Sequence, residues 1–387
     1  MQPLRILLVL ETSGGGSGRH VLDLAGALTA RGHRVHVAWS PRRAERAFVQ
    51  RLADLPAVTA HALPMTRQPG PADGPALWRL RRLLRRAGPF DVVHAHSSKA
   101  GTLARLATLG LPAATLYTPH AIYTMNPGLS ARQRRLYGVI ERLLARLNCD
   151  RIIAVSREEL DHLRALGLPE ARLALVVNGV PPLPEGRRRR WRAQVRAELG
   201  AGPDEVVVGF VGRMDRQKAP ERFVAVAERL RHLAARWVML GSGERAAAVD
   251  AAIAASGLGP RLRRLAEADG QTWLAGCDLF VMTSRYEAMP YVYLEALAAG
   301  LPIVTTDVGG AGTVVAPGEN GHIVAQEAGV SGLAEAVCGL IEDPARRAAM
   351  ARAARARARR FSLDAMVART LDVYAAALAE AGAAVPV

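Results

Sequence analysis

The stretch Ser284–Gly310, SRYEAMPYVYLEALAAGLPIVTTDVGG, predicts a loop, a helix, a buried strand and a glycine turn in succession. We expect the strand at Pro302–Thr306 and the turn at Gly309–Gly310. Two glutamates, Glu287 and Glu295, stand eight positions apart, one before the helix and one two turns inside it. Ionised carboxylates accept hydrogen bonds from hydroxyl groups, and a helix N-terminus attracts phosphate. The segment is therefore expected to bind two sugar-like rings on either side of a phosphate.

The same alternation of apolar runs and amphipathic segments continues along the chain, which is typical of parallel, doubly wound α/β sheets. In such sheets ligands bind beyond the carboxyl ends of the strands, so the loops that follow the strands are the candidate sites. The expected strands are Arg5–Leu10, Arg34–Trp39, Asp91–His94, Ala114–Thr118, Arg151–Val155, Leu173–Val177, Val206–Val211, Arg236–Leu240, Asp278–Thr283 and Pro302–Thr306. The expected helices include His20–Ala30, Ala76–Arg86, Ala100–Leu109 and Ala131–Leu147.

A chain of 387 residues suits two domains rather than one core. The alternation breaks at Pro181–Gly186, PPLPEG, which is followed by four arginines and has the composition of a linker. We expect a first domain at residues 1–180, a linker at 181–194 and a second domain at 195–361. A last helix within residues 362–387 is expected to complete the first domain.

The basic charge is confined to one half of the chain. The net charge is +16, and residues 1–190 hold 29 Lys and Arg against 13 Asp and Glu, whereas the remainder holds 22 of each. A genome rich in arginine codons explains arginine in place of lysine but not this asymmetry. Attraction of the first half to anionic lipid or another polyanionic partner explains it better.

Cysteine usage and hydropathy predict the compartment. The three cysteines, Cys149, Cys277 and Cys338, form no CxxC or CxxH pair, which fits a reducing environment without a disulfide framework or structural zinc. The apolar run after Arg5 is too short for a signal peptide, and no segment approaches 18 apolar residues. We therefore expect a cytoplasmic protein that does not span a membrane.

Two basic amphipathic helices are candidates for attachment to a lipid surface. Ala76–Arg86 carries Trp78 beside five arginines, and Ser130–Leu147 has a continuous apolar face. Each helix also needs an apolar face to cover its own sheet. Because both lie in the basic half, we favour peripheral membrane attachment. The predicted apolar faces are Leu77, Leu80, Leu83 and Leu84 in the first, and Leu136, Val139, Ile140, Leu143 and Leu144 in the second.

The first strand runs into a glycine loop, Ser13–His20, and then into a helix. Glycines at a helix start allow backbone amides to approach an anion. The loop is not a dinucleotide fingerprint, because the third glycine of GxGxxG falls on Arg19 or Val21. The alternative is a plain tight turn.

A second loop, Gly212–Pro220, follows the strand Val206–Val211 and has the composition of a diphosphate clamp. Arg213 offers a planar fork and Lys218 a compact charge. Lys218 is one of only two lysines in a chain with 49 arginines, which suggests that the ammonium itself is needed. No DxD pair is present to hold a divalent ion, so we expect the diphosphate charge to be neutralised without metal.

Histidines also follow two of the strands. His94 and His96 lie in HAHSSKAG and His120 lies in TPH. We interpret His94 as a packing residue and place His96 and His120 at the site. The two are not expected to form a metal set.

Together these loops resemble the retaining glycosyltransferases of family 4, essentially over the whole chain. The motifs that carry the resemblance are the loop Gly14–Gly18, HAHSSKAG, TPH at Thr118–His120, AVS at Ala154–Ser156, NGV at Asn178–Val180, GRM…QK at Gly212–Lys218, and E-x7-E followed by AAGLPIV and VGG. The resemblance implies the GT-B fold: two facing doubly wound domains with a cleft between them and a C-terminal helix that crosses back. It also implies that the second domain binds a nucleotide-sugar, with a UDP-sugar favoured, and the first binds the acceptor.

The resemblance further implies a role for each site residue. Glu287 would hold sugar hydroxyls, Glu295 the ribose, and Arg213 and Lys218 the departing diphosphate. The remaining donor contacts would be the backbone amides of Ala288, Met289 and Pro290, those of Gly15 and Gly16 from the other domain, and His120 beside the reacting sugar. Glu287, His120, Arg213 and Lys218 would be the catalytic residues. His96, Lys99 and Asn178 would lie on the acceptor side. The implied transfer retains the anomeric configuration and uses no metal or cofactor.

The chain departs from the family pattern in two places, and three functions stay open. Ala288 replaces a glycine and would narrow the freedom of its loop. Leu262–Trp273 is shorter than usual and lacks the family's typical strand–Leu–Gly pattern that brackets the base. The favoured function is transfer to a lipid-linked saccharide in cell-surface polysaccharide or glycolipid synthesis. The alternatives are a soluble acceptor or a nucleotide-sugar 2-epimerase, and a non-enzymatic protein that binds polyanions. We expect no nucleic-acid partner.

Overall fold

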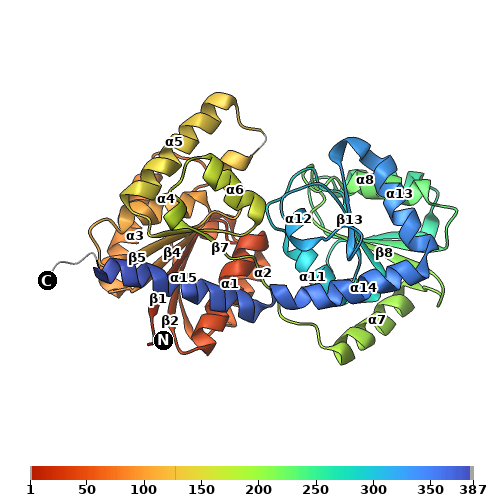
Figure 1. Cartoon of the computed structure of the whole chain (residues 1–387), viewed down its shortest axis with the longest axis horizontal. Coiled ribbons are helices and arrows are strands. Elements are labelled where there is room, and N and C mark those ends of the chain that lie inside the picture. Colours follow the sequence, from red (N-terminus) through yellow and green to blue (C-terminus); the bar gives the residue numbers. More distant parts are fainter. Residues whose placement is uncertain (1, 127, 384–387) are drawn as a thin grey trace. The chain divides into compact units, whose positions relative to one another are not determined.

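The computed structural model describes residues 2–126 and 128–383 and forms two compact units (Figure 1). Unit 1 runs to Asn178 and resumes at Leu363, and unit 2 comprises Gly179–Ser362. Every strand pair in both units is parallel, and the sheets have seven and six strands. The predicted α/β class is therefore confirmed.

Unit 1 is a doubly wound sheet with the strand order β3-β2-β1-β4-β5-β6-β7. Its elements are β1 Arg5–Leu10, α1 Gly15–Ala30, β2 Arg34–Trp39, α2 Arg46–Ala53, β3 Val58–Ala62, α3 Asp73–Ala87, β4 Val92–His96, α4 Ser98–Ala107, β5 Ala114–Thr118, α5 Ala131–Leu147, β6 Arg151–Ala154, α6 Arg157–Ala165, β7 Leu173–Leu175 and α15 Leu363–Ala383. The order reverses between β1 and β4, so the loops after these two strands open at the position where such sheets bind ligands.

Alternation along β1 shows why both faces of this sheet are covered. Ile6 and Leu8 point into a core shared with α1 and α15, whereas Leu7 and Val9 point into a core shared with α3 and α4. A strand buried on both faces reads as a continuous apolar run, as in RILLVL. The C-terminal helix α15 thus belongs to unit 1, where its Tyr374 is fully buried.

Unit 2 has the strand order β10-β9-β8-β11-β12-β13, which is that of the Rossmann fold. Its elements are α7 Glu185–Leu199, β8 Val206–Val211, α8 Pro220–Arg229, β9 Ala235–Leu240, α9 Ala246–Ala255, β10 Leu262–Leu265, α10 Gly270–Gly276, β11 Leu279–Met282, α11 Tyr291–Ala299, β12 Ile303–Thr306, α12 Ala311–Val314, β13 Gly321–Val324, α13 Gly329–Glu342 and α14 Pro344–Ala358. The order reverses between β8 and β11, and the predicted diphosphate loop and first glutamate follow these two strands.

The stretch expected as a linker at 181–194 is largely a helix of unit 2. α7 begins at Glu185 and packs on α10, where a Cβ on Gly276 would lie 2.2 Å from the Val195 side chain. On the same helix, Arg192 and Arg196 both pair with Asp278, at 2.5 and 2.8 Å. The arginine-rich composition suggested a solvated segment, but these guanidinium groups bind a carboxylate of the sheet and hold the helix in place.

Three strands were not predicted: β3, β10 and β13. Each lies at an edge of its sheet, where only one neighbour pairs with it. β3 is half-buried or exposed throughout, and β10 has the sequence LRRL, so neither shows the apolar run of a central strand. The segment from Leu262 does form a strand, β10, which pairs with β9, although no Leu-Gly follows it.

Two of the three cysteines are buried. Cys149 and Cys277 are buried free thiols, and burial raises the pKa of Cys149 to about 12, which makes it unreactive. Among residues 2–126 and 128–383, no helix combines the length and the apolar composition that a membrane crossing requires.

Candidate active site

In unit 2, the loops after β8 and β11 are joined by hydrogen bonds at the point where the strand order reverses. The Arg285 N–H donates to the Gln217 carbonyl at 2.8 Å, and the Gln217 side-chain amide donates to the Tyr286 carbonyl at 3.0 Å. The buried Thr283 hydroxyl donates to the carbonyls of Lys218 and Ala219, both at 3.0 Å. The two loops therefore form one structure at the carboxyl edge of the sheet.

An ion pair lies at the centre of this structure. The Lys218 ammonium is 2.7 Å from Glu287 Oε1, and the two side chains are 13% and 7% exposed. Gln217 supports the carboxylate from the other side, with Nε2 3.4 Å from Glu287 Oε2. The sequence assigned the two charges separately, one to diphosphate and one to sugar hydroxyls, and did not predict their direct contact. In the absence of ligand, each neutralises the other.

Arg213, the second predicted diphosphate ligand, differs from Lys218 in its setting. Its side chain is 67% exposed and pairs with Asp215 at 3.1 Å and with the Gln217 amide oxygen at 3.3 Å. Asp215 also accepts the Lys218 N–H at 2.9 Å and so orders the turn. Because exposed ion pairs are weak and long side chains rotate freely, Arg213 can move to a ligand at little cost.

The paired glycines allow the Glu287 loop to lie against the turn after β12. A Cβ on Gly309 would be 2.3 Å from the Glu287 carbonyl oxygen, closer than any real contact. Gly310 has a φ of 81°, and a Cβ there would be 2.8 Å from the Ala288 carbonyl oxygen. The Ala288 backbone, by contrast, is not in the left-handed region, so alanine fits where the family has glycine.

The helix that carries the second glutamate, α11, corrects one predicted donor contact. Pro290 is its N-cap residue and has no N–H, so it cannot supply the amide expected of it. Its carbonyl instead accepts from the Tyr293 N–H at 3.2 Å. Met289 is buried beside Gly310, and Glu295 is half-buried in the second turn of α11.

The glycine loop of unit 1 already holds an anion. The Gly15 N–H donates to a carboxylate oxygen of Glu45 at 3.1 Å, and a Cβ on Gly14 would be 2.5 Å from the same carboxylate group. Gly15 has a φ of 55° and starts α1, with Gly16 in its first turn. The loop thus binds a carboxylate of the same chain. An external anion would compete with Glu45 for the Gly15 N–H.

Histidines from three elements gather at the carboxyl edge of the unit 1 sheet. His96 ends β4, His120 follows β5, and His20 lies on α1. The Nδ1 atom of His96 is 3.1 Å from Nε2 of His120, and the His20 ring centroid is 5.3 and 4.7 Å from those of His96 and His120. The sequence pointed to the first two and missed His20, which is remote along the chain.

His94 has the packing role expected of it. Both ring nitrogens are engaged, Nδ1 with the Tyr374 hydroxyl at 2.8 Å and Nε2 with the Thr118 hydroxyl at 2.7 Å. Burial lowers the pKa of His20 to about 4 and holds those of His94, His96 and His120 well below the usual 6.5. These rings are therefore neutral near pH 7.

The backbone at His120 is in an unusual conformation that the sequence did not indicate. His120 and Ala121 have φ values of 53° and 74°. The buried Glu159 carboxylate accepts from the N–H groups of Ala121 and Ile122 at 2.8 and 3.0 Å, and from Val155 at 2.9 Å. Glu159 is therefore a positioning residue, because it fixes the loop that presents His120.

Two residues predicted on the acceptor side are bound to other groups of unit 1. The Lys99 ammonium is 2.5 Å from Asp73 and donates to the Gln68 carbonyl, and its side chain is only 8% exposed. Asn178 is buried, with Oδ1 3.0 Å from Nδ1 of His20. Lys99 is therefore held in an ion pair within unit 1, whereas Asn178 contacts a histidine of the cluster.

Comparison with known proteins identifies the family. Residues 14–182 match the sequence model of the family "Glycosyltransferase Family 4", and residues 205–343 match that of "Glycosyl transferases group 1". A D-inositol 3-phosphate glycosyltransferase of Xylanimonas cellulosilytica is 31% identical, over 94% of this chain and 92% of its own length. The chain belongs to glycosyltransferase family 4. An alpha-maltose-1-phosphate synthase of Mycolicibacterium smegmatis is 30% identical, over 93% of this chain and 95% of its own length.

Solved structures show the same fold. Anabaena Alr3699/HepE in complex with UDP superposes with a TM-score of 0.80 at 21% identity, covering 96% of this chain and 100% of that one. WaaG, a glycosyltransferase involved in lipopolysaccharide biosynthesis, gives a TM-score of 0.71 at 18% identity, with 96% and 99% coverage. The predicted GT-B fold and enzyme class are confirmed, and the non-enzymatic alternative is excluded.

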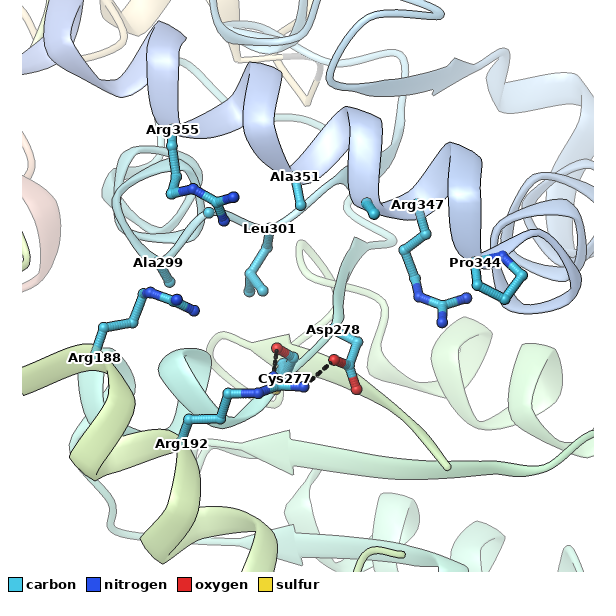
Figure 2. Close-up of a pocket in the computed structure, with 12 residues that line it drawn as sticks. Arg188, Arg192, Cys277, Asp278, Ala299, Leu301, Pro344, Arg347, Ala351 and Arg355 are labelled. Atoms are coloured by element: carbon cyan, nitrogen blue, oxygen red, sulfur yellow. Dashed lines mark hydrogen bonds and ion pairs between the residues drawn. The ribbon is translucent and has the colours of Figure 1, made fainter. Parts of the chain in front are cut away.

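A cavity of about 320 Å³ in unit 2 of this family 4 transferase is separate from the Lys218–Glu287 pair. It lies beside Cys277 and Asp278, which precede β11, and so at the amino edge of the sheet. Four arginines surround it (Figure 2). Three of them bind groups of the chain: Arg188 to Glu185, Arg192 to Asp278 and Arg347 to the Leu340 carbonyl. Position and occupied charges both argue against a donor site here.

Proposed function

We propose that this chain transfers a sugar from a nucleotide-diphosphate sugar, with UDP as the favoured nucleotide, to an acceptor hydroxyl with retention of anomeric configuration. The observation that carries the proposal is the buried Lys218–Glu287 pair where the strand order of unit 2 reverses. A diphosphate and a sugar together offer the anion that Lys218 needs and the hydroxyl donors that Glu287 needs. When a nucleotide-sugar binds, the ion pair between Lys218 and Glu287 is thus replaced by contacts of Lys218 with the diphosphate and of Glu287 with the sugar hydroxyls. The HepE complexes with UDP and UDP-glucose support the choice of nucleotide.

The chemistry follows from these contacts. The bond between the anomeric carbon and the diphosphate oxygen breaks, and a bond from that carbon to the acceptor oxygen forms on the same face. The acceptor proton passes to the leaving phosphate, so no enzyme carboxylate acts as a base. Lys218 and Arg213 stabilise the negative charge on the diphosphate, and Glu287 positions the sugar. We assign Glu295 to the ribose, and His120 with the Gly16 amide to the sugar from unit 1.

We further propose that the transfer needs no divalent ion on the diphosphate. Lys218 and Arg213 supply two positive charges next to the donor, and the sequence has no DxD pair to hold a metal there. Activity measured after dialysis against EDTA is expected to equal that of the untreated enzyme. A loss that Mg²⁺ or Mn²⁺ restores would refute the metal-free assignment.

A thermal-shift screen tests the proposed donor. UDP-, GDP- and ADP-sugars are added singly, in EDTA, to wild type and to Lys218→Ala, with the free sugars as controls. A donor at 100 times its dissociation constant is expected to stabilise the wild type by about 2.7 kcal/mol, and the lysine variant much less. If no nucleotide-sugar raised the melting temperature of the wild type, the proposed function would fail.

For the acceptor, we propose a lipid-linked saccharide at an anionic membrane surface, because of the outward face of α5. Leu136, Val139, Leu143 and Leu147 on this helix are 58%, 46%, 55% and 57% exposed. They recur at helical spacing and form one apolar stripe, and exposed arginines flank it, Arg132, Arg135 and Arg146 among them. The likeness to a D-inositol 3-phosphate glycosyltransferase and an alpha-maltose-1-phosphate synthase instead favours a soluble phosphorylated acceptor, which is the second candidate.

The inward face of α5 explains why this stripe is unusual. Gly138, Glu141 and Leu144 of this helix are buried against the rest of unit 1, and the Glu141 carboxylate pairs with the buried Arg105. The sequence had placed Leu144 on the same face as the exposed leucines, whereas it is buried. In α3, by contrast, Leu80 and Leu84 are buried, and Trp78 is the large apolar side chain of this helix that is exposed.

Replacing two leucines of the stripe tests the membrane assignment. Leu136→Ser with Leu143→Ser is expected to weaken binding to phosphatidylglycerol vesicles by about 100-fold, since each buried leucine contributes roughly 1.5 kcal/mol. The matched control is Leu109→Ser, an exposed leucine of unit 1 outside α5, which should bind as wild type does. Sedimentation with vesicles measures both. Equal binding by the double variant, or no salt-sensitive binding by wild type, would favour the soluble acceptor.

A further inference from the structure

The three histidines His20, His96 and His120 have the arrangement of a metal-binding set. One ring nitrogen from each lies within 4.8 Å of the other two. A tetrahedral zinc ion with nitrogen ligands at about 2.0–2.1 Å holds them about 3.3 Å apart, so no pair has to approach by more than about 1.5 Å. The residues come from α1, from the end of β4 and from the loop after β5, so the fold of unit 1 brings them together.

The contacts of His20 and His96 bear on how each ring can ligate a metal. The Asn178 amide oxygen accepts only, so its contact of 3.0 Å fixes the proton of His20 on Nδ1 and makes Nε2 the accepting nitrogen of that ring. An oxygen on the second ring nitrogen is the usual support of a metal-ligating histidine. His96 is fully buried, and its Nε2 atom has no hydrogen-bond partner. Its Nδ1 atom lies 3.1 Å from Nε2 of His120, a contact that is given up when either ring ligates through that nitrogen. A buried imidazole nitrogen without a partner is costly, and coordination would satisfy it.

We propose that His20, His96 and His120 bind a zinc-type divalent cation, and that the bound ion inhibits sugar transfer. Three neutral imidazoles with a fourth position open to water or substrate are a typical zinc set. Inhibition rests on the proposed function, because it requires that His120 contacts the donor sugar. An ion that engages His120 removes it from that contact. This metal is distinct from one on the diphosphate, which the transfer does not need.

Neighbouring histidines do not offer an equivalent site. Both ring nitrogens of His94 bind hydroxyl groups. His36 and His61 lie 3.0 Å apart, nitrogen to nitrogen, but among the described residues no third His, Cys, Asp or Glu completes that pair into a set. His36 and His61 are therefore the matched control for the three-histidine cluster.

Calorimetric titration of Zn²⁺ into the metal-free chain tests binding, and Co²⁺ spectra identify the ligands. We expect one ion per chain and visible cobalt bands without the thiolate charge-transfer absorption that Cys338 would give. His20→Ala and His96→Gln should each weaken Zn²⁺ binding by roughly 100-fold or more, and Asn178→Ala by about tenfold. His61→Ala should bind as wild type does. Circular dichroism checks that each variant is folded.

The outcomes separate binding from inhibition. Absence of zinc binding by wild type, thiolate bands with cobalt, or loss of binding in His61→Ala but not in His20→Ala would each overturn the metal site. If binding is found as expected, Zn²⁺ should inhibit UDP-sugar turnover by wild type at concentrations that leave His20→Ala uninhibited, and EDTA should reverse the effect. Zinc that binds without inhibiting would refute the inhibitory role and leave the donor assignment to its own test.

Discussion

Lys218→Ala is expected to lower the rate of sugar transfer at saturating donor by about 100- to 1000-fold, the loss typical when one group that stabilises developing charge is removed. The ammonium lies at the carboxyl edge of the unit 2 sheet and is held by Glu287 at 2.7 Å. Without it, the leaving diphosphate loses its buried cation, whereas the exposed Arg213 remains. The rate is measured as nucleotide released per enzyme with donor and acceptor both saturating.

Three further variants show whether the loss is specific. Glu287→Gln keeps the shape but removes the charged acceptor for sugar hydroxyls, so it should also lose most activity. Lys218→Arg retains a positive charge without the compact ammonium and should fall between wild type and Lys218→Ala. The control is Arg285→Ala, a neighbouring exposed cation that pairs with Glu221 and should keep wild-type rates. Rates within threefold of wild type for Lys218→Ala would contradict the assignment.

Glu141→Ala is expected to destabilise unit 1 by about 3–5 kcal/mol, because it leaves a buried guanidinium without its counter-charge. The Arg105 side chain is fully buried, its Nη2 atom lies 2.8 Å from Glu141 Oε2, and its guanidinium stacks 4.5 Å from the centre of the Tyr117 ring. Urea titration followed by hydrogen exchange of β4 and β5 peptides measures the change in unit 1 separately from unit 2.

Two comparisons interpret that result. Glu170→Ala removes an exposed partner of Arg164 in the same unit and should leave the urea midpoint unchanged. Replacing both members of the buried pair, Arg105→Met with Glu141→Leu, should recover much of the lost stability, since apolar residues of similar volume need no counter-charge. A Glu141→Ala variant as stable as wild type would show that water reaches Arg105.

The central strands could be predicted from the sequence because burial on both faces produces continuous apolar runs. β1, β2, β5 and β8 have the predicted bounds, and β4 differs only at its ends. Edge strands such as β10, with two arginines in four residues, carry no such pattern. Their pairing depends on a neighbouring strand that a different segment of the sequence forms, so the residues of the edge strand alone do not reveal it.

The site was predicted in its parts but not in its contacts. Parallel strands bring their carboxyl ends to one edge, so Lys218 and Glu287 could each be placed at a ligand-binding edge. Their direct pairing depends on β8 and β11 being neighbours, which only the strand order decides. The same holds for His20, which meets His96 because β1 and β4 are adjacent.

Two further site residues gave no signal in the sequence. Glu45 accepts a hydrogen bond from the Gly15 N–H, 30 residues away in the sequence. Glu159 binds the loop of His120 through two backbone N–H groups and accepts a third from Val155, which follows β6. Carboxylates are common at exposed positions, so neither residue stands out by type or spacing. Their roles follow from burial and from backbone hydrogen bonds, which the structure alone supplies.

Hydrogen exchange with and without saturating UDP, in EDTA, locates the donor site most directly. Bound UDP is expected to slow exchange of amides in the loops after β8 and β11, residues 212–219 and 284–292, and in the glycine turn at 307–311. Peptides around the arginine-lined cavity at residues 344–355 should exchange as in the free enzyme. Protection confined to the cavity, or absent from all three loops, would contradict a donor site built on Lys218 and Glu287.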